Sequence, residues 1–174
     1  MAWSVAPAPH GLIGAQPIEV TDTVKNHALG TIVYATGRPL GATASVECTG
    51  EFMYARGVAS TVVGSLVYLN RATGVTTLNT ETAGAAWPLA VAMSANTADR
   101  YGWYQISGYA LIKKTAVSIA GLGKLYQSET AGSVEGVASA TFEIHGARVA
   151  STTSTSTSAT WVLAFINRPH MEGQ

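Results

Sequence analysis

Residues 99–114 read DRYGWYQISGYALIKK, a strand-forming segment with large apolar side chains on both of its alternating faces. Successive side chains of a β-strand point to opposite faces. Tyr101 and Trp103 therefore share one face, and Tyr104 and Ile106 share the other. Because neither face is polar, we expect Tyr104 and Ile106 in the core. We expect Tyr101 and Trp103 to be partly buried against a loop or a neighbouring subunit.

The rest of the chain has the same character. Short runs rich in Val, Ile, Thr and Tyr alternate with Gly, Asn or Thr-Gly turn signals, which is typical of a sandwich or barrel. No stretch keeps the helical apolar spacing for three turns, although a short helix over 20–29 is a possible exception. The predicted strands are 31–35, 44–47, 51–56, 65–70, 75–78, 89–94, 101–107, 109–113, 124–127, 147–151 and 159–167. The predicted fold is all-β, a β-sandwich or small barrel of short antiparallel strands.

Residues 1–18 differ from the remainder and predict an extended N-terminal arm, followed by a single β domain over 19–174. Prolines in this segment favour extended backbone outside a strand ladder. Trp3, Leu12 and Ile13 are large apolar residues for a free tail, so we expect the arm to dock on a neighbour. The tract STTSTSTS at 151–158 is predicted to be an exposed loop.

Composition limits the function classes. The 174 residues carry ten basic and ten acidic side chains, and charged residues make up only 11% of the chain. No basic stripe suited to nucleic acid is present, and no apolar run is long enough to span a membrane. A start without signal-peptide features predicts synthesis in a cytoplasm. A surface so poor in charge favours a homo-oligomer or larger assembly, in which neighbours cover it.

No sequence motif supports catalysis. The chain has no G-x-S-x-G elbow and no phosphate-binding loop, and its four His residues are too far apart to suggest a metal site. Cys48, the single cysteine, is interpreted as a structural thiol. We therefore expect no enzymatic activity, no catalytic or metal-binding residues and no cofactor.

Three motifs carry a resemblance to a known group of proteins. They are G-x-x-V-Y at 64–68, P-x-A-V-A-M at 88–93 and Y-G-W-Y-Q-I-x-G at 101–108. In this order, and together with GLIGAQPIEVTDTVKNHALGTIVYA near the start and FINRPH near the end, they resemble the small β-rich structural proteins of tailed-bacteriophage virions. The likeness is to the capsid decoration, or cement, type.

This resemblance implies a non-enzymatic virion protein that binds the outer surface of the assembled capsid and stabilises it. Its partner would be the major capsid protein, and it would form dimers or trimers after synthesis in the bacterial host cytoplasm. Neither nucleic acid nor membrane is an expected partner. The predicted interface residues are Trp3, Leu12, Ile13, Tyr101 and Trp103. The alternatives are another virion β protein, such as a head fibre, tail or baseplate component, and a carbohydrate-binding module that stacks sugars on exposed aromatic rings.

Overall fold

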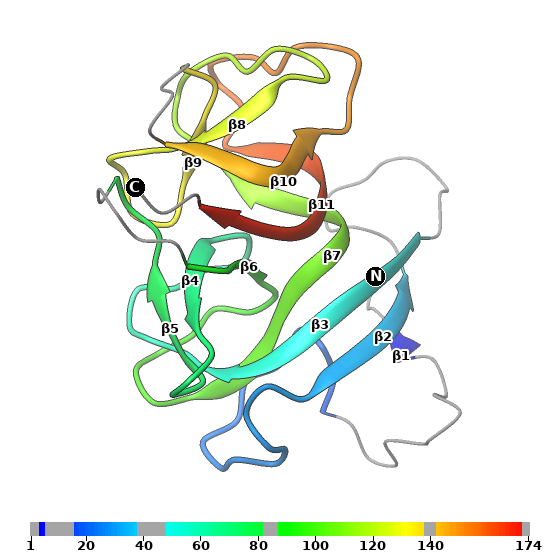
Figure 1. Ribbon diagram of the computed structural model, residues 1–174, viewed down its shortest axis with the longest axis vertical. Coiled ribbons are helices and arrows are strands. Elements are labelled where there is room, and N and C mark those ends of the chain that lie inside the picture. The colour runs from blue at the N-terminus through cyan, green and yellow to red at the C-terminus, as the bar shows by residue number, and fades with distance from the viewer. Residues whose placement is uncertain (1–3, 6–15, 38–47, 82–86, 138–141, 172–174) are drawn as a thin grey trace.

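The computed structural model describes residues 4–5, 16–37, 48–81, 87–137 and 142–171. These residues form eleven strands and no helix, which confirms the predicted all-β fold (Figure 1). The strands are β1 (Ser4–Val5), β2 (Ile32–Gly37), β3 (Cys48–Arg56), β4 (Leu66–Asn70), β5 (Val75–Leu78), β6 (Leu89–Ala92), β7 (Tyr101–Lys113), β8 (Lys124–Gln127), β9 (Val134–Glu135), β10 (Glu143–Val149) and β11 (Trp161–Met171).

The strands join in one sheet with the order β1-β2-β3-β5-β4-β6-β7-β11-β10-β8-β9. The sheet is mixed, because β3 and β5 pair in parallel whereas the other strand pairs are antiparallel. A further pairing of β3 with β7 closes β3, β5, β4, β6 and β7 into a ring. This ring is compatible with the small-barrel alternative, and closure leaves its strands without open edges. Figure 1 shows the ring in the lower half and β8–β11 above it.

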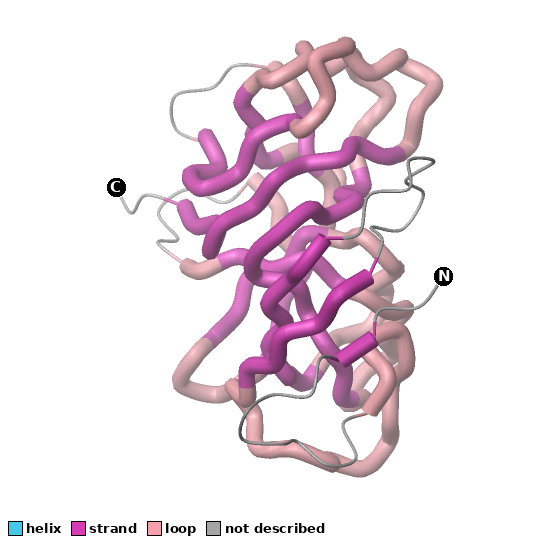
Figure 2. Tube along the Cα trace, turned by 90° about the vertical axis from the view of Figure 1, so that its right-hand side faces the viewer, coloured by secondary structure: helices cyan, strands magenta, loops and turns pink. Residues whose placement is uncertain are grey.

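Strand β7, with thirteen residues, links the two halves of the molecule. Its first half pairs with β3 and β6, and its second half pairs with β11. Gly108 lies between the halves with a backbone φ of +102°, where an L side chain is strained. The predicted strands 101–107 and 109–113 are therefore one continuous strand that changes partners at this glycine. In the view turned by 90°, the strands cross the middle of the molecule and loops gather at both ends (Figure 2).

Three apolar clusters fill the structure. One draws on every strand of the ring and forms its interior: Met53, Ala55, Val67, Leu69, Ala90, Ala92, Tyr104 and Ile106, with Leu78 at its edge. A second cluster joins the opposite faces of β4 and β6 to β7, β8, β10 and β11. The third lies under residues 16–31: Ile18, Val33, Ala35, Phe52, Tyr54, Met93 and Trp103. β7 contributes to all three clusters, which explains why both of its faces are apolar.

The ring interior also contains a polar group that is hydrogen-bonded. The Tyr104 hydroxyl accepts a hydrogen bond of 2.7 Å from the Asn96 side-chain amide and contacts the Thr76 hydroxyl at 3.5 Å. All three side chains are buried. Because a buried polar group without a partner is costly, these bonds make Tyr104 compatible with the centre of the ring. Its predicted core position is confirmed.

Residues 16–31 form turns and not the short helix considered for 20–29. Asp22 pairs through its backbone with Tyr101, with both N–O distances at 2.9 Å, and this extended contact replaces helical hydrogen bonding. Gln16 and Ile18 are 6% and 1% exposed. The expected arm boundary after residue 18 therefore lies inside a packed segment, and the β domain includes residues 16–18. β1 pairs with β2, so part of the expected arm belongs to the sheet of its own chain.

Two connections between strands are well defined. The antiparallel pairing of β4 with β5 forms a hairpin around residues 70–74. The Ser/Thr tract is mostly exposed, as predicted, and it is also anchored. Thr155 accepts a 3.0 Å bond at its hydroxyl from the Ile119 amide, and its own amide donates to the Ile119 carbonyl at 2.9 Å. The predicted strand 44–47 lies outside the described residues.

Candidate functional site

An exposed apolar surface lies on the outward side of β7 and β11. Alternation along both strands turns five large side chains away from the second cluster; they form the outer aromatic face: Tyr109, Leu111, Trp161, Leu163 and Phe165. Tyr109, Phe165 and Trp161 are 38%, 47% and 37% exposed. A contiguous apolar patch of this kind is typical of a surface that contacts another molecule.

Strand register assembles this face. Tyr109 lies opposite Phe165, Leu111 opposite Leu163, and Lys113 opposite Trp161. Paired side chains in an antiparallel ladder stand about 5 Å apart, close enough to pack as a unit. The Tyr109 and Phe165 rings meet edge to face, with centroids 5.4 Å apart.

Trp161 at the end of the face depends on a glycine. A Cβ built on Gly64 would lie 2.2 Å from the Trp161 ring, far inside van der Waals contact. Gly64 also has a φ of +77°, which other residues rarely adopt. The glycine in the turn before β4 thus leaves room for the indole to pack against it, while 37% of the Trp161 residue stays exposed.

Basic side chains border the outer aromatic face. Arg148 on β10 lies opposite Phe165 in register and is exposed, and Lys113 lies opposite Trp161. Neither has an ion-pair partner among the described residues. Next in the row, Lys124 is bonded to Glu143 at 2.5 Å, and this bond lowers the pKa of the Glu143 carboxyl. The face is therefore apolar in the centre and positive at the rim, which suits a partner with carboxylates around an apolar spot.

The two β7 residues that were predicted to lie at an interface, Tyr101 and Trp103, belong to the third apolar cluster and not to the outer aromatic face. Trp103 is 0% exposed, and its indole N–H donates a 3.0 Å hydrogen bond to the Gln16 carbonyl. Tyr101 packs against the same cluster and stacks on Tyr54, with ring centroids 6.2 Å apart. The expected covering is therefore intramolecular for Trp103, because residues 16–31 of its own chain bury it. Trp3, Leu12 and Ile13 lie outside the described residues.

A sugar-stacking platform on this strand would need several exposed rings on one face. Trp103 is buried and Tyr101 is half-buried in the third cluster, whereas Tyr109 lies beyond Gly108 on the outer aromatic face. The Tyr109 and Phe165 rings are inclined by 68° and so do not form a flat surface. Tyr101, Trp103 and Tyr109 therefore do not assemble a sugar-stacking platform.

No protein-family model, curated protein or solved structure matches this chain.

No set of three or more His, Cys, Asp or Glu side chains in the described part of the chain could hold a metal ion. Burial raises the pKa of Glu135, with a smaller contribution from the Glu81 and Glu129 carboxylates. Burial also raises the pKa of the Cys48 thiol, which lowers its reactivity and fits a structural role. No helix in the described residues is long and apolar enough to cross a membrane.

Proposed function

We propose that this protein is a non-enzymatic capsid decoration protein of a tailed bacteriophage, and that it binds the outer surface of the assembled capsid through the outer aromatic face. The observation that carries the proposal is the exposure of Tyr109, Trp161 and Phe165 in a chain with only 11% charged residues. Aromatic residues are enriched at the centres of protein interfaces, where they contribute most of the binding energy.

The chemistry of the outer aromatic face suits a protein partner that carries carboxylates around an apolar spot. Lys113 and Arg148 at the rim favour carboxylates on the major capsid protein, and the apolar centre favours an aliphatic or aromatic spot on it. The three sequence motifs that resemble cement proteins support the capsid as the partner. Binding energy would come from burying the apolar centre, while the basic rim would set orientation and association rate.

Stabilisation of the shell would be additive. Each copy contributes an interface of modest area, and a dimer or trimer that spans neighbouring capsid subunits makes the second contact intramolecular. The effective concentration of that second contact is high, so release of the whole oligomer is slow even when each contact is weak. The location on the capsid exterior and the oligomeric state are parts of this proposal.

The test is binding to capsids that lack this protein, measured by co-sedimentation and electron microscopy. The variant Tyr109→Thr/Phe165→Thr keeps strand propensity and removes both rings. Full burial of an aromatic side chain is worth about 1.5–3 kcal/mol, and roughly half of each ring remains to be buried. We therefore expect affinity per site to fall by about 2 kcal/mol, or roughly 30-fold.

The matched control is Tyr34→Thr, which removes a 52% exposed aromatic side chain from a strand, β2, outside the outer aromatic face. It should bind capsids like the unaltered chain. Equal binding by the double variant and the control would refute the assignment of this face. An unaltered chain that associates only with tails or baseplates would refute the capsid assignment and favour another virion component.

The arm is tested separately by removing residues 1–15. The deletion must stop there because Gln16 and Ile18 are buried in the β domain. We expect weaker capsid decoration by a chain that still folds, judged by a circular dichroism spectrum that keeps its β character after the loss of the two-residue strand β1. A deletion variant that decorates capsids normally would contradict a role for Trp3, Leu12 and Ile13.

A further inference from the structure

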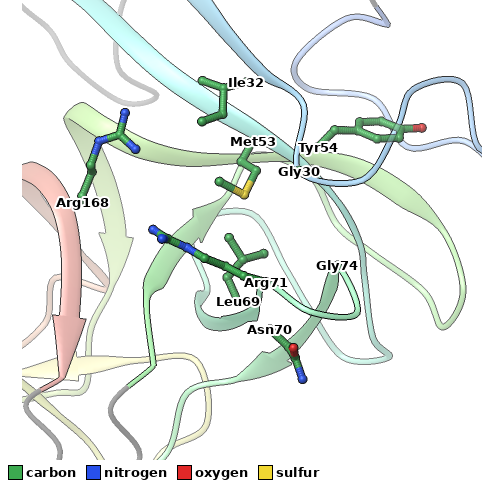
Figure 3. A pocket seen from close by; sticks show the side chains of 9 residues that line it. All are labelled: Gly30, Ile32, Met53, Tyr54, Leu69, Asn70, Arg71, Gly74 and Arg168. Atoms are coloured by element: carbon green, nitrogen blue, oxygen red, sulfur yellow. The ribbon is translucent and has the colours of Figure 1, made fainter.

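A cavity of about 250 Å³ opens beside β3 and the β4–β5 turn (Figure 3). Its apolar lining consists of Ile32, Met53 and Leu69, and its polar lining includes Arg71 and Arg168. A water molecule occupies about 30 Å³ of liquid, so the space corresponds to roughly eight waters and suits a small organic ligand. The cavity is distinct from the outer aromatic face, which contributes no residue to its lining.

The turn that carries Arg71 is fixed by its own hydrogen bonds. The Asn70 side-chain oxygen accepts bonds from the amides of Ala72 and Thr73 at 3.0 and 3.2 Å. The Gly74 amide closes the turn by donating to the Asn70 carbonyl at 2.7 Å. Gly74 has a φ of +67°, and a Cβ there would overlap Leu29. Arg71 is thus presented by a rigid loop, so little backbone entropy is lost when it binds a ligand.

The Arg71 guanidinium has no ion-pair or hydrogen-bond partner among the described residues, although its five N–H donors match a carboxylate. Figure 3 shows it extending over Leu69 toward the side of the cavity where Arg168 lies. Arg168 is bonded to Glu51 at 2.6 Å. Two guanidinium groups and one carboxylate leave the rim with an excess positive charge.

The backbone conformation of Arg168 is a second observation, besides the Arg71 guanidinium left unpaired by the described residues, that points to a binding site here. Its φ is +47°, a left-handed conformation that costs a non-glycine residue free energy and is enriched at functional positions. This residue lines the main cavity and a small adjoining one, which also touches Met53, Leu69 and Ile106. The cationic rim therefore stands directly over the apolar interior of the ring.

From this arrangement we propose that the cavity binds a carboxylate carried on a small apolar body. The Arg71 guanidinium donates two parallel hydrogen bonds to the carboxylate, and the apolar body rests on Ile32, Met53 and Leu69. The same chemistry is offered by a free organic acid and by an acidic side chain next to an apolar residue on a partner protein. The inference does not depend on the capsid assignment.

The experiment titrates the unaltered chain, labelled with ¹³C at its methionine methyls, with 3-phenylpropionate and with the capped peptide acetyl-Phe-Glu-amide. Binding should be in about the millimolar range, as expected for so small a ligand. The Met53 methyl should shift, and the Met93 methyl, which belongs to the third cluster, should not. A shift of the Met53 methyl with the free acid identifies a site for small molecules. A shift with the peptide alone identifies a site for an acidic side chain of a partner protein.

Charge and shape are tested separately. Arg71→Gln should weaken binding roughly tenfold or more, Arg71→Lys should be intermediate, and Arg100→Gln, which changes an arginine outside the cavity, should have no effect. 3-Phenylpropanol, which lacks the charge, and inorganic phosphate, which lacks the apolar body, should both bind more weakly. The proposal is overturned if neither acid nor peptide shifts Met53, if the alcohol binds as tightly as the acid, or if a folded Arg71→Gln variant binds normally.

Discussion

Gly108 provides a direct test of how β7 connects the two halves of the molecule. Its φ of +102° strains any L residue, and conversion to Ala should cost about 1–2 kcal/mol for conformation alone. A Cβ at this position would also lie 2.6 Å from the Thr49 carbonyl oxygen and 3.1 Å from the Gly50 Cα. Both atoms belong to the backbone of β3, which cannot move without disturbing the ladder. Such overpacking adds about 1–3 kcal/mol, so Gly108→Ala should destabilise the fold by about 2–5 kcal/mol.

Gly30 is the matched control. Its φ is +86°, and a Cβ there meets nothing within 4 Å, so Gly30→Ala carries the conformational cost without the clash. Urea unfolding followed by tryptophan fluorescence gives both midpoints. With a slope of about 2 kcal/mol per molar urea, the two variants should differ by roughly 0.5–1.5 M. If Gly108→Ala is no less stable than Gly30→Ala, the close approach of β7 to β3 does not constrain the fold and this reasoning is wrong.

Three further predictions concern buried and ionisable groups. Tyr104→Phe leaves the buried Asn96 amide without its 2.7 Å partner and should cost about 1–3 kcal/mol in the same unfolding assay; an unchanged midpoint would contradict this. The hydrogen bond from Lys124 lowers the pKa of the Glu143 carboxyl below 4.5. The negative charge of Glu143 therefore stabilises the fold above pH 4.5, and this contribution is lost as the pH falls through the folded-state pKa. Glu143→Gln should therefore lower the urea midpoint at pH 7 and have no effect in strong acid. Burial raises the pKa of Glu135 above 4.5, so its charged form destabilises the fold at pH 7. Glu135→Gln should raise the midpoint at pH 7 and lose that advantage below pH 4.5, and the same sign for both variants would refute the assignments.

Much of the strand pattern could be predicted because turn residues delimit it. β5 and β8 have the predicted bounds of 75–78 and 124–127. The break predicted at Gly108 was wrong because a glycine with positive φ lets the backbone continue in the ladder. The helix considered for 20–29 does not form because Asp22 pairs with Tyr101, a contact between residues far apart in the sequence.

The surface was harder to predict than the fold. Alternation correctly divides β7 into two faces but contains no information on which segment covers each face. Trp103 is buried by residues 16–31, and this depends on the Gln16 carbonyl lying next to its indole N–H. Trp161 and Phe165 are exposed because β11 is covered on one side only, although ATWVLAFIN reads as apolar along most of its length.

The pairing of β7 with β3, β6 and β11 has a consequence for the order in which the chain folds. The ring cannot close until residues 101–113 have been synthesised, so β3 stays without β7, with which it pairs along six residues, while residues 57–100 are made. At about 5–20 residues per second this interval lasts several seconds. During it the apolar strands β3 and β4 are available for non-native pairing, and contacts of such long sequence separation also form slowly. Production of the native protein should therefore respond to chaperone supply and translation speed, independently of the final stability of the fold.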